Sequence, residues 1–221
     1  PCPQKGHCYC IEKLYSMCMR MTTGNILDRI ISKWVRLGAA FNAASARKTP
    51  DIEQLLIDTA LVMPQFARIH SMMISWLVCY QRLVCRHRLA ALAKRMESPQ
   101  QSAALGLTLT LCRNRAESDH FNLAIKACKP LSPPMPMFQI DRQNEKLSDL
   151  AQKLSCREGR HWGLWTPQER LYEDAIRPHS WIMRKNPSLH KRAIFSGKLQ
   201  ASILVTLESD PSAGRSESAL A

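Results

Sequence analysis

The chain has 221 residues, a formal net charge of +13 and 45% hydrophobic residues. This length allows one large or two small domains with a buried core, and the ordinary apolar fraction excludes wholesale disorder. No apolar run is long enough to span a bilayer, because the best one, residues 72–84, is interrupted by Ser75, Gln81 and Arg82. The first residues also lack the apolar region of a secretion signal. We therefore expect an intracellular, cytoplasmic protein with no membrane partner.

The excess of positive charge indicates a class of partner and not a fold. Nucleic acid is the obvious candidate, because Lys and Arg neutralise phosphates and release counterions. An acidic protein partner, or a segment outside this sequence that balances the charge, is the alternative. Composition alone favours nucleic acid slightly.

Residues 1–20 hold four of the nine cysteines and look unlike the rest of the chain. Met21 is followed by small polar residues and then by an amphipathic pattern, as at the start of many chains. We therefore interpret residues 1–20 as an extension upstream of a natural start. The alternative is a zinc site that Cys8, Cys10 and Cys18 form with Cys2 or His7. Their spacing lacks the two paired knuckles of a strong zinc motif, so we expect no metal and no cofactor. The other five cysteines stand singly in apolar patterns, which predicts small buried side chains: Cys79, Cys85, Cys112, Cys128 and Cys156.

An N-terminal helical domain is predicted over residues 21–128. Apolar residues recur at three- and four-residue steps, which predicts helices over about residues 25–46, 52–63, 66–80, 86–96, 99–115 and 120–128. Pro64 should break the second helix, and Ser98 followed by Pro99 should start the fifth. His70 lies near an apolar stripe of the third helix, where we interpret it as a satisfied buried histidine. Four methionines are expected in the core, with an exposed interface as the alternative: Met63, Met72, Met73 and Met96.

Residues 129–138 are the clearest linker, because four prolines in ten residues cannot form an interior helix or a central strand. A Trp-rich helical segment follows over residues 139–197. It has an expected helix over about residues 142–156, a capping box at residues 166–169 with a helix behind it, and a further helix around residues 189–195. This segment contains three tryptophans: Trp162, Trp165 and Trp181. They could form a stacking platform for bases. Their helical spacing favours the alternative, in which they pack this segment on the helical core.

The last segment, residues 198–221, carries the most specific pattern. Leu199, Ile203, Leu204 and Leu207 predict an apolar helix, a turn with Pro and Gly follows, and Ser216 is then placed as the N-cap of a second helix. This pattern resembles the opening of the winged helix-turn-helix of bacterial transcription regulators. The resemblance implies a partial DNA-binding domain, with the recognition helix and wing outside this sequence. Since no segment shows convincing two-residue alternation, we predict an all-α fold, an irregular multi-helix bundle that ends in these first helices.

The stretch around the start of this motif is basic. In winged-helix modules, basic residues near the first helix contact phosphates and fix register without reading sequence. We therefore predict DNA-phosphate contacts from six residues: Arg184, Lys185, His190, Lys191, Arg192 and Lys198. A solvated helix face is the alternative. We expect the binding of this chain to DNA to be weak and non-specific.

Together these patterns predict a DNA-binding transcriptional regulator, not an enzyme, whose helical domain dimerises or binds a protein partner. A helical interaction module without nucleic-acid binding is the alternative. A second alternative rests on Arg113-Asn114 and His120, which resemble the catalytic motif of the all-helical HEPN ribonucleases; that resemblance implies an Arg–His cluster at a dimer interface. Arg82 with His87 fits the looser spacing equally well. Phosphate-binding glycine loops, nucleophile elbows and zinc-protease motifs are absent from the sequence.

Overall fold

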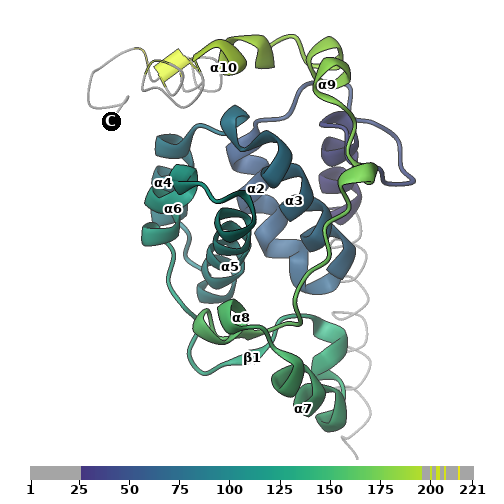
Figure 1. Ribbon diagram of the computed structural model, residues 1–221, viewed down its shortest axis with the longest axis vertical. Coiled ribbons are helices and arrows are strands. Elements are labelled where there is room, and N and C mark those ends of the chain that lie inside the picture. Colours follow the sequence, from purple (N-terminus) through teal and green to yellow (C-terminus); the bar gives the residue numbers. More distant parts are fainter. Residues whose placement is uncertain (1–25, 196–199, 201–202, 205–206, 208–213, 215–221) are drawn as a thin grey trace, which may run out of the picture.

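Helices form nearly all the regular structure in the computed structural model, which describes residues 26–195 together with Gln200, Ile203, Leu204, Leu207 and Gly214 (Figure 1). A first helix over residues 26–36 is followed by α2 (Ile52–Val62), α3 (Ala67–Tyr80), α4 (Arg86–Lys94), α5 (Pro99–Ala116), α6 (Asn122–Ala127), α7 (Glu145–Leu154), α8 (Arg157–His161), α9 (His179–Lys185) and α10 (Leu189–Phe195). Short 3₁₀ turns lie between them: η1 (Met63–Gln65), η2 (Gln81–Leu83), η3 (Asp119–Phe121), η4 (Gln139–Arg142) and η5 (Glu173–Ala175). The predicted all-α class is confirmed.

The core is built around α5, which packs against α2 and α3 on one side and α6 on the other, while α4 packs on α2 and α6. Residues 102–112 of α5 are all buried, as expected for a central helix that is apolar on every side. Ser98 caps this helix, as predicted, by accepting a hydrogen bond from the Gln101 amide at 3.3 Å. The helix α2 ends at Val62, as the position of Pro64 predicts, and Pro64 itself lies in the turn η1 that follows. The methionines of this region, Met63, Met72 and Met73, are buried, so the core interpretation is confirmed for them.

The first helix is shorter than its apolar pattern predicts. It ends at residue 36, and Gly38 then adopts a left-handed backbone with φ of +92°. Glycine adopts this conformation at little cost, so it terminates helices readily. The chain continues to residue 50 without helix, and Phe41 packs on the core from this non-helical segment. The predicted extension to residue 46 is therefore wrong.

The proline-rich segment, residues 129–138, is packed against the body of the protein. The Leu131 amide donates to the Trp162 carbonyl at 3.0 Å, and two-residue strands β1 (Met135–Pro136) and β2 (Leu164–Trp165) pair in parallel. Met137 and Phe138 are buried in the same core cluster as the helices before them. This segment is therefore packed against residues on both of its sides, and the boundary between subdomains expected there stays a prediction.

The expected helix behind residues 166–169 does not form. The chain is irregular from Thr166 to Tyr172, and the carboxylate of Glu169 accepts hydrogen bonds from α3 instead of capping a helix. The capping-box prediction is wrong because a tertiary contact uses the side chain that the local motif requires.

Three of the five single cysteines are buried as predicted, namely Cys85, Cys112 and Cys128. Burial raises the pKa of the Cys112 and Cys128 thiols to about 12, so both stay protonated. Cys79 is exposed, so the prediction of burial is wrong for that residue, and Cys156 is half-buried. The zinc alternative with Cys2, Cys8, Cys10 and Cys18 lies outside the described residues. Within them, no group of three His, Cys, Asp or Glu residues is arranged to hold a metal ion.

Across the described part of the chain, no helix has both the length and the apolar character needed to cross a bilayer. Along the long axis of the molecule, α9 and α10 lie at one end and α7 lies at the other (Figure 1).

Candidate nucleic-acid interface

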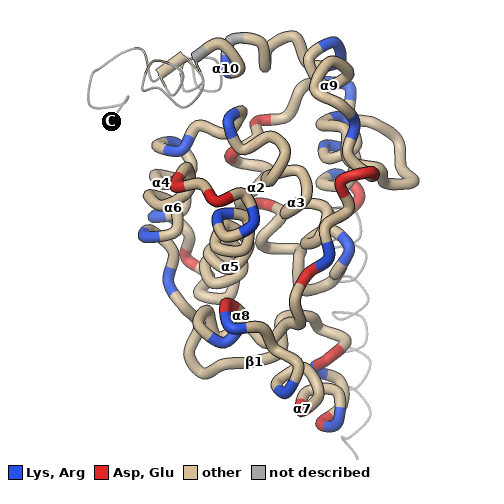
Figure 2. Tube along the Cα trace, viewed as in Figure 1, with Lys and Arg blue, Asp and Glu red and all other residues tan. Residues whose placement is uncertain are grey.

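The end formed by α9 and α10 carries the predicted phosphate-contacting residues. Arg184 and Lys185 lie in the last turn of α9 and His190 in the first turn of α10, and all three are exposed. No Asp or Glu occurs in the sequence between Asp174 and Glu208. Within the described residues, no carboxylate forms an ion pair with Arg184 or Lys185. Figure 2 shows the resulting cluster of basic positions on α9.

Asn186 and Arg36 hold α9 in place. The buried Asn186 amide donates to the Arg36 carbonyl at 2.9 Å and to the Ile182 carbonyl at 3.0 Å. The Arg36 guanidinium donates in return to Asn186 Oδ1 at 3.2 Å and to the Lys185 carbonyl at 2.5 Å. A cation at the C-terminus of α9 also stabilises that helix through its dipole. The backbone that carries Arg184 and Lys185 is thus anchored, while their side chains point into solvent.

Arg192 was predicted to contact phosphate, but the structure places it in the interior. Its Nη1 donates to Glu53 Oε1 at 2.7 Å, to Glu53 Oε2 at 3.0 Å and to the Leu83 carbonyl at 3.2 Å. Glu53, in the first turn of α2, is fully buried. The Arg192 guanidinium therefore docks α10 on α2 and η2, and the Arg192 side chain is only 8% exposed.

Three further residues join this cluster, of which Asp51 and Arg88 are half-buried and Cys85 is buried. The Arg88 guanidinium donates to Asp51 at 2.5 Å and to Glu53 Oε2 at 3.2 Å, and the Cys85 amide donates to Glu53 Oε1 at 2.7 Å. Burial raises the pKa of the Asp51 carboxyl, but the hydrogen bond and positive charge of Arg88 outweigh burial and leave the pKa below its usual range. Sequence reasoning missed Glu53, since a glutamate in a first helical turn ordinarily faces solvent.

Two exposed arginines extend the basic surface beyond α9. Arg82 lies in η2, which packs against α10, and Arg86 begins α4. Both stand close to His120, whose ring bonds to the Val84 carbonyl at 2.9 Å. Burial lowers the pKa of His120, and the charges of Arg86 and Arg82 lower it further. Arg82 and Arg86 were not among the predicted interface residues. The local sequence does not show the packing of η2 on α10 that brings Arg82 to this end. We call Arg82, Arg86, Arg184, Lys185 and His190 the basic end.

A shallow groove of about 570 Å³ runs between α9 and α10. Its lining combines basic and apolar side chains: His179, Ser180, Met183, Arg184, His190, Ala193 and Ile194. Ile194 is 75% exposed, which is high for an isoleucine. The groove can therefore accept a ligand that has an apolar part beside an anionic group. The side chain of Lys191 and the whole of Lys198 lie outside the described residues.

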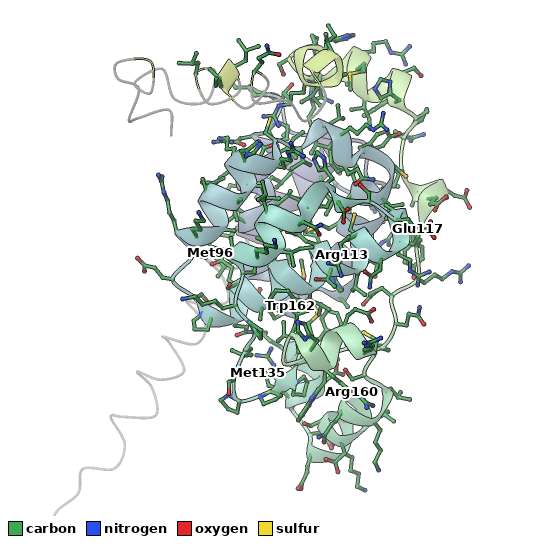
Figure 3. All side chains as sticks on the ribbon, turned by 60° about the vertical axis from the view of Figure 1, so that its left-hand side comes forward. Met96, Arg113, Glu117, Met135, Arg160 and Trp162 are labelled. Carbon is green, nitrogen blue, oxygen red and sulfur yellow. The ribbon has the colours of Figure 1, made fainter. Side chains whose placement is uncertain are left out.

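The tryptophans behave mainly as core residues. Trp162 is 3% exposed, and its indole nitrogen donates to Thr110 Oγ1 at 3.0 Å. Figure 3 shows it between α5 and α8, where a Cβ added to Gly106 would lie 2.3 Å from its ring. Trp162 is thus unavailable for base stacking, whereas Trp165 and Trp181 are half-buried. The preference for core contacts is confirmed for Trp162.

In the ribonuclease alternative, His120 is engaged apart from Arg113 and Asn114. The helix α5 ends at Ala116, and Glu117 follows with a left-handed φ of 47° (Figure 3). The Arg113 guanidinium donates to Asn114 Oδ1 at 3.3 Å, and Asn114 donates to Glu158 at 2.8 Å. His120 lies beyond the helix end with its ring on the Val84 carbonyl. The expected helix end between Arg115 and His120 is therefore present, and the three residues form no common cluster.

A second buried polar cluster joins α3 to the segment after β2. His70 Nδ1 lies 3.1 Å from Glu169 Oε1, and the Ser71 hydroxyl donates to Glu169 Oε2 at 2.5 Å. Burial raises the pKa of Glu169, but the hydrogen bond and charge of His70, with Ser71 and Thr166, bring it below its usual value. Ser71 bonds to the carboxylate and not to the histidine, so the three side chains lack the serine–histidine hydrogen bond of a catalytic triad. His70 is buried as predicted, but only half satisfied, because its Nε2 has no partner among the described residues.

Comparisons of the chain with protein-family models, with curated proteins and with solved structures found no match.

Proposed function

We propose that this chain is part of a DNA-binding transcriptional regulator and supplies phosphate contacts from its basic end. The observation that carries the proposal is the group of exposed cations on α9, η2 and the start of α4, which form no ion pair within the described residues and stand next to a stretch of sequence without acidic residues. Such a surface attracts a polyanion by counterion release and does not select a base sequence. We expect weak binding that depends strongly on salt.

The place of the basic end along the chain supports the same function. The helix α10 ends at Phe195, and the segment that resembles a winged helix-turn-helix begins at Lys198. Among its described residues, Gln200, Ile203, Leu204 and Leu207 are helical. Cations on α9 and η2 would therefore lie near the DNA that such a domain reads, where phosphate contacts fix register.

The test is a titration of labelled duplex DNA followed by fluorescence anisotropy, at salt concentrations between about 50 and 200 mM. If the four arginine and lysine side chains of the basic end each neutralise one phosphate, the slope of log K against log salt is about −3 to −4. The double variant Arg184→Gln, Lys185→Gln should bind about 2- to 30-fold more weakly and reduce that slope by about 2.

The matched control removes two exposed lysines on α6 and just after it, Lys126→Gln with Lys129→Gln. It lowers the net charge equally, so it measures the effect of charge alone. Equal losses for both double variants, or absence of binding by the unaltered chain at low salt, would contradict the proposal.

One observation favours the alternative of a helical protein-interaction module: α7 carries three partly exposed leucines, Leu147, Leu150 and Leu154, whose side chains are 39%, 50% and 59% exposed. The ribonuclease alternative gains no such support, because the His120 ring bonds to the Val84 carbonyl, away from the pair that Arg113 and Asn114 form. RNA cleavage that is abolished by His120→Ala would restore it.

A further inference from the structure

The helices α4 and α6 lie side by side, and a groove of about 560 Å³ runs between them (Figure 1). Packed helices stand about 8–10 Å apart, so a seam lined mainly by alanine methyl groups is left hollow. The apolar part of the lining has one buried alanine, two half-buried alanines and a leucine that is 44% exposed: Ala90, Ala91, Ala127 and Leu123. We call this hollow the α4–α6 groove.

Three exposed cations line the same groove. Lys94 and Arg95 stand at the end of α4, and Lys126 stands on α6. Within the described residues, none of the three forms an ion pair with a carboxylate. The sequence has no Asp or Glu over residues 59–96 or over residues 120–140, which include both helices. The groove therefore combines an apolar floor with an uncompensated positive charge.

The dimensions and chemistry of the groove indicate what it can hold. His87, Ala91 and Lys94 follow one another at steps of four and three residues, so they share one face of α4, about 10 Å long. Duplex DNA would meet the cations with its phosphates but would bring no apolar group to the floor. Among the described residues that line the groove there is also no Phe, Tyr or Trp on which a base could stack. An amphipathic helix with acidic residues beside its apolar face complements both the floor and the cations.

We propose that the α4–α6 groove binds a short, acidic amphipathic helix of a protein partner. Apolar side chains of that helix fill the space over Ala91 and Ala127, and its carboxylates pair with Lys94, Arg95 and Lys126. The groove shares no residue with the basic end, so the proposal stands independently of nucleic-acid binding. Two short helices offer less than the roughly 800 Å² per partner of a standard interface. We therefore expect a dissociation constant of about micromolar or higher.

The test is fluorescence anisotropy of a labelled synthetic peptide titrated with the full chain at low salt. The peptide has about 14 residues, with leucine at positions i, i+3, i+4 and i+7 of a helix and glutamate elsewhere, so that it is helical and amphipathic. It should bind reversibly. A second peptide of the same composition, with its leucines spread over all faces, should bind about tenfold more weakly because fewer leucines enter the groove together.

Variants of the chain then locate the site. Lys94→Gln with Lys126→Gln should weaken binding of the amphipathic peptide about 2- to 30-fold through the loss of two charge contacts. Leu123→Gln, at an exposed position, should weaken it about threefold or more through the loss of apolar contact. The control Arg184→Gln with Lys185→Gln lowers the net charge equally and should leave the affinity for the peptide unchanged. All variants should keep the circular dichroism spectrum of the unaltered chain.

Three results would overturn the proposal. The first is absence of peptide binding by the unaltered chain, or equal binding of the two peptides. The second is an equal loss of affinity in the two double variants, since net charge alone would then explain the binding. The third is displacement of the peptide by unlabelled duplex DNA from the control variant Arg184→Gln with Lys185→Gln, because the groove would then be a surface for nucleic acid and not for a protein.

Discussion

Removing the carboxylate charge of Glu53 should destabilise the protein more than removing its partner Arg192. Glu53→Gln keeps the size of the side chain but leaves Arg192 buried, with the Leu83 carbonyl as its other acceptor at 3.2 Å. Arg88 suffers less, because its guanidinium keeps Asp51 at 2.5 Å. Breaking a buried ion pair from one side typically costs about 3–5 kcal/mol, and we expect Glu53→Gln to fall in this range.

The opposite change has a smaller expected effect. In Arg192→Met the carboxylate of Glu53 keeps the Cys85 amide at 2.7 Å and Arg88 at 3.2 Å, so it remains hydrogen-bonded and paired. We expect a loss of about 1.5–3 kcal/mol, the range for a hydrogen bond to a charged group. The double variant should lose less than the sum of the two, with a coupling energy of about 1–3 kcal/mol.

Urea unfolding followed by circular dichroism measures these free energies, and hydrogen exchange of the α10 amides reports whether α10 detaches before the rest unfolds. We expect faster exchange over residues 189–195 in both single variants. A larger loss for Arg192→Met than for Glu53→Gln, or additive losses in the double variant, would refute the reasoning that Arg192 depends on Glu53 more than Glu53 depends on Arg192.

Three further variants test the packing of the helices. Gly106→Ala should lower the free energy of unfolding by about 1–3 kcal/mol, because the added Cβ meets the Trp162 ring. This loss is expected although alanine favours helices more than glycine does. In a urea titration, the additional change Trp162→Leu should remove most of the loss. Ser98→Ala should cost about 1 kcal/mol through loss of the α5 cap, measured as a lower urea midpoint at constant slope. The pKa of His120 is lowered in the folded state, so stability is full above its ordinary value of 6.5 and declines as the pH falls through the folded pKa. His120→Gln, whose amide can still donate to the Val84 carbonyl, should flatten that decline between pH 7 and 5, and an unchanged decline would rule out His120 as its source.

Local signals allowed most helices to be predicted, and distant contacts explain the failures. Pro64 and the pair Ser98-Pro99 act within one helical turn, so helix ends at these points lie within a residue or two of the prediction. The segment with Glu169 carries an equally good local motif, but His70 and Ser71, about a hundred residues earlier, bind its carboxylate. A one-dimensional pattern contains no information about such a competitor.

In the candidate interface, too, local sequence signals predict some features and distant contacts determine the others. The exposed cations of α9 follow from a basic run in the sequence, whereas Arg192 looks equivalent to them and is buried. Its partner Glu53 lies 139 positions away, and only the docking of α10 on η2 brings the two together. The same docking adds Arg82 to the surface and buries Arg192 on Glu53, and the local sequence shows neither position.

The contacts of Arg36 with Asn186 and of Glu53 with Arg192 also determine when the basic end can form during synthesis. These pairs are separated by 150 and 139 residues, so a growing polypeptide holds Arg36 and Glu53 long before their partners leave the ribosome. The helices α2 to α6 can assemble first, because their contacts with one another close much shorter loops. A nascent or truncated product that stops before Asn186 would keep that bundle and lack the anchored cations. The charged surface is thus completed only with the last helices, and its presence reports that translation has passed Arg192.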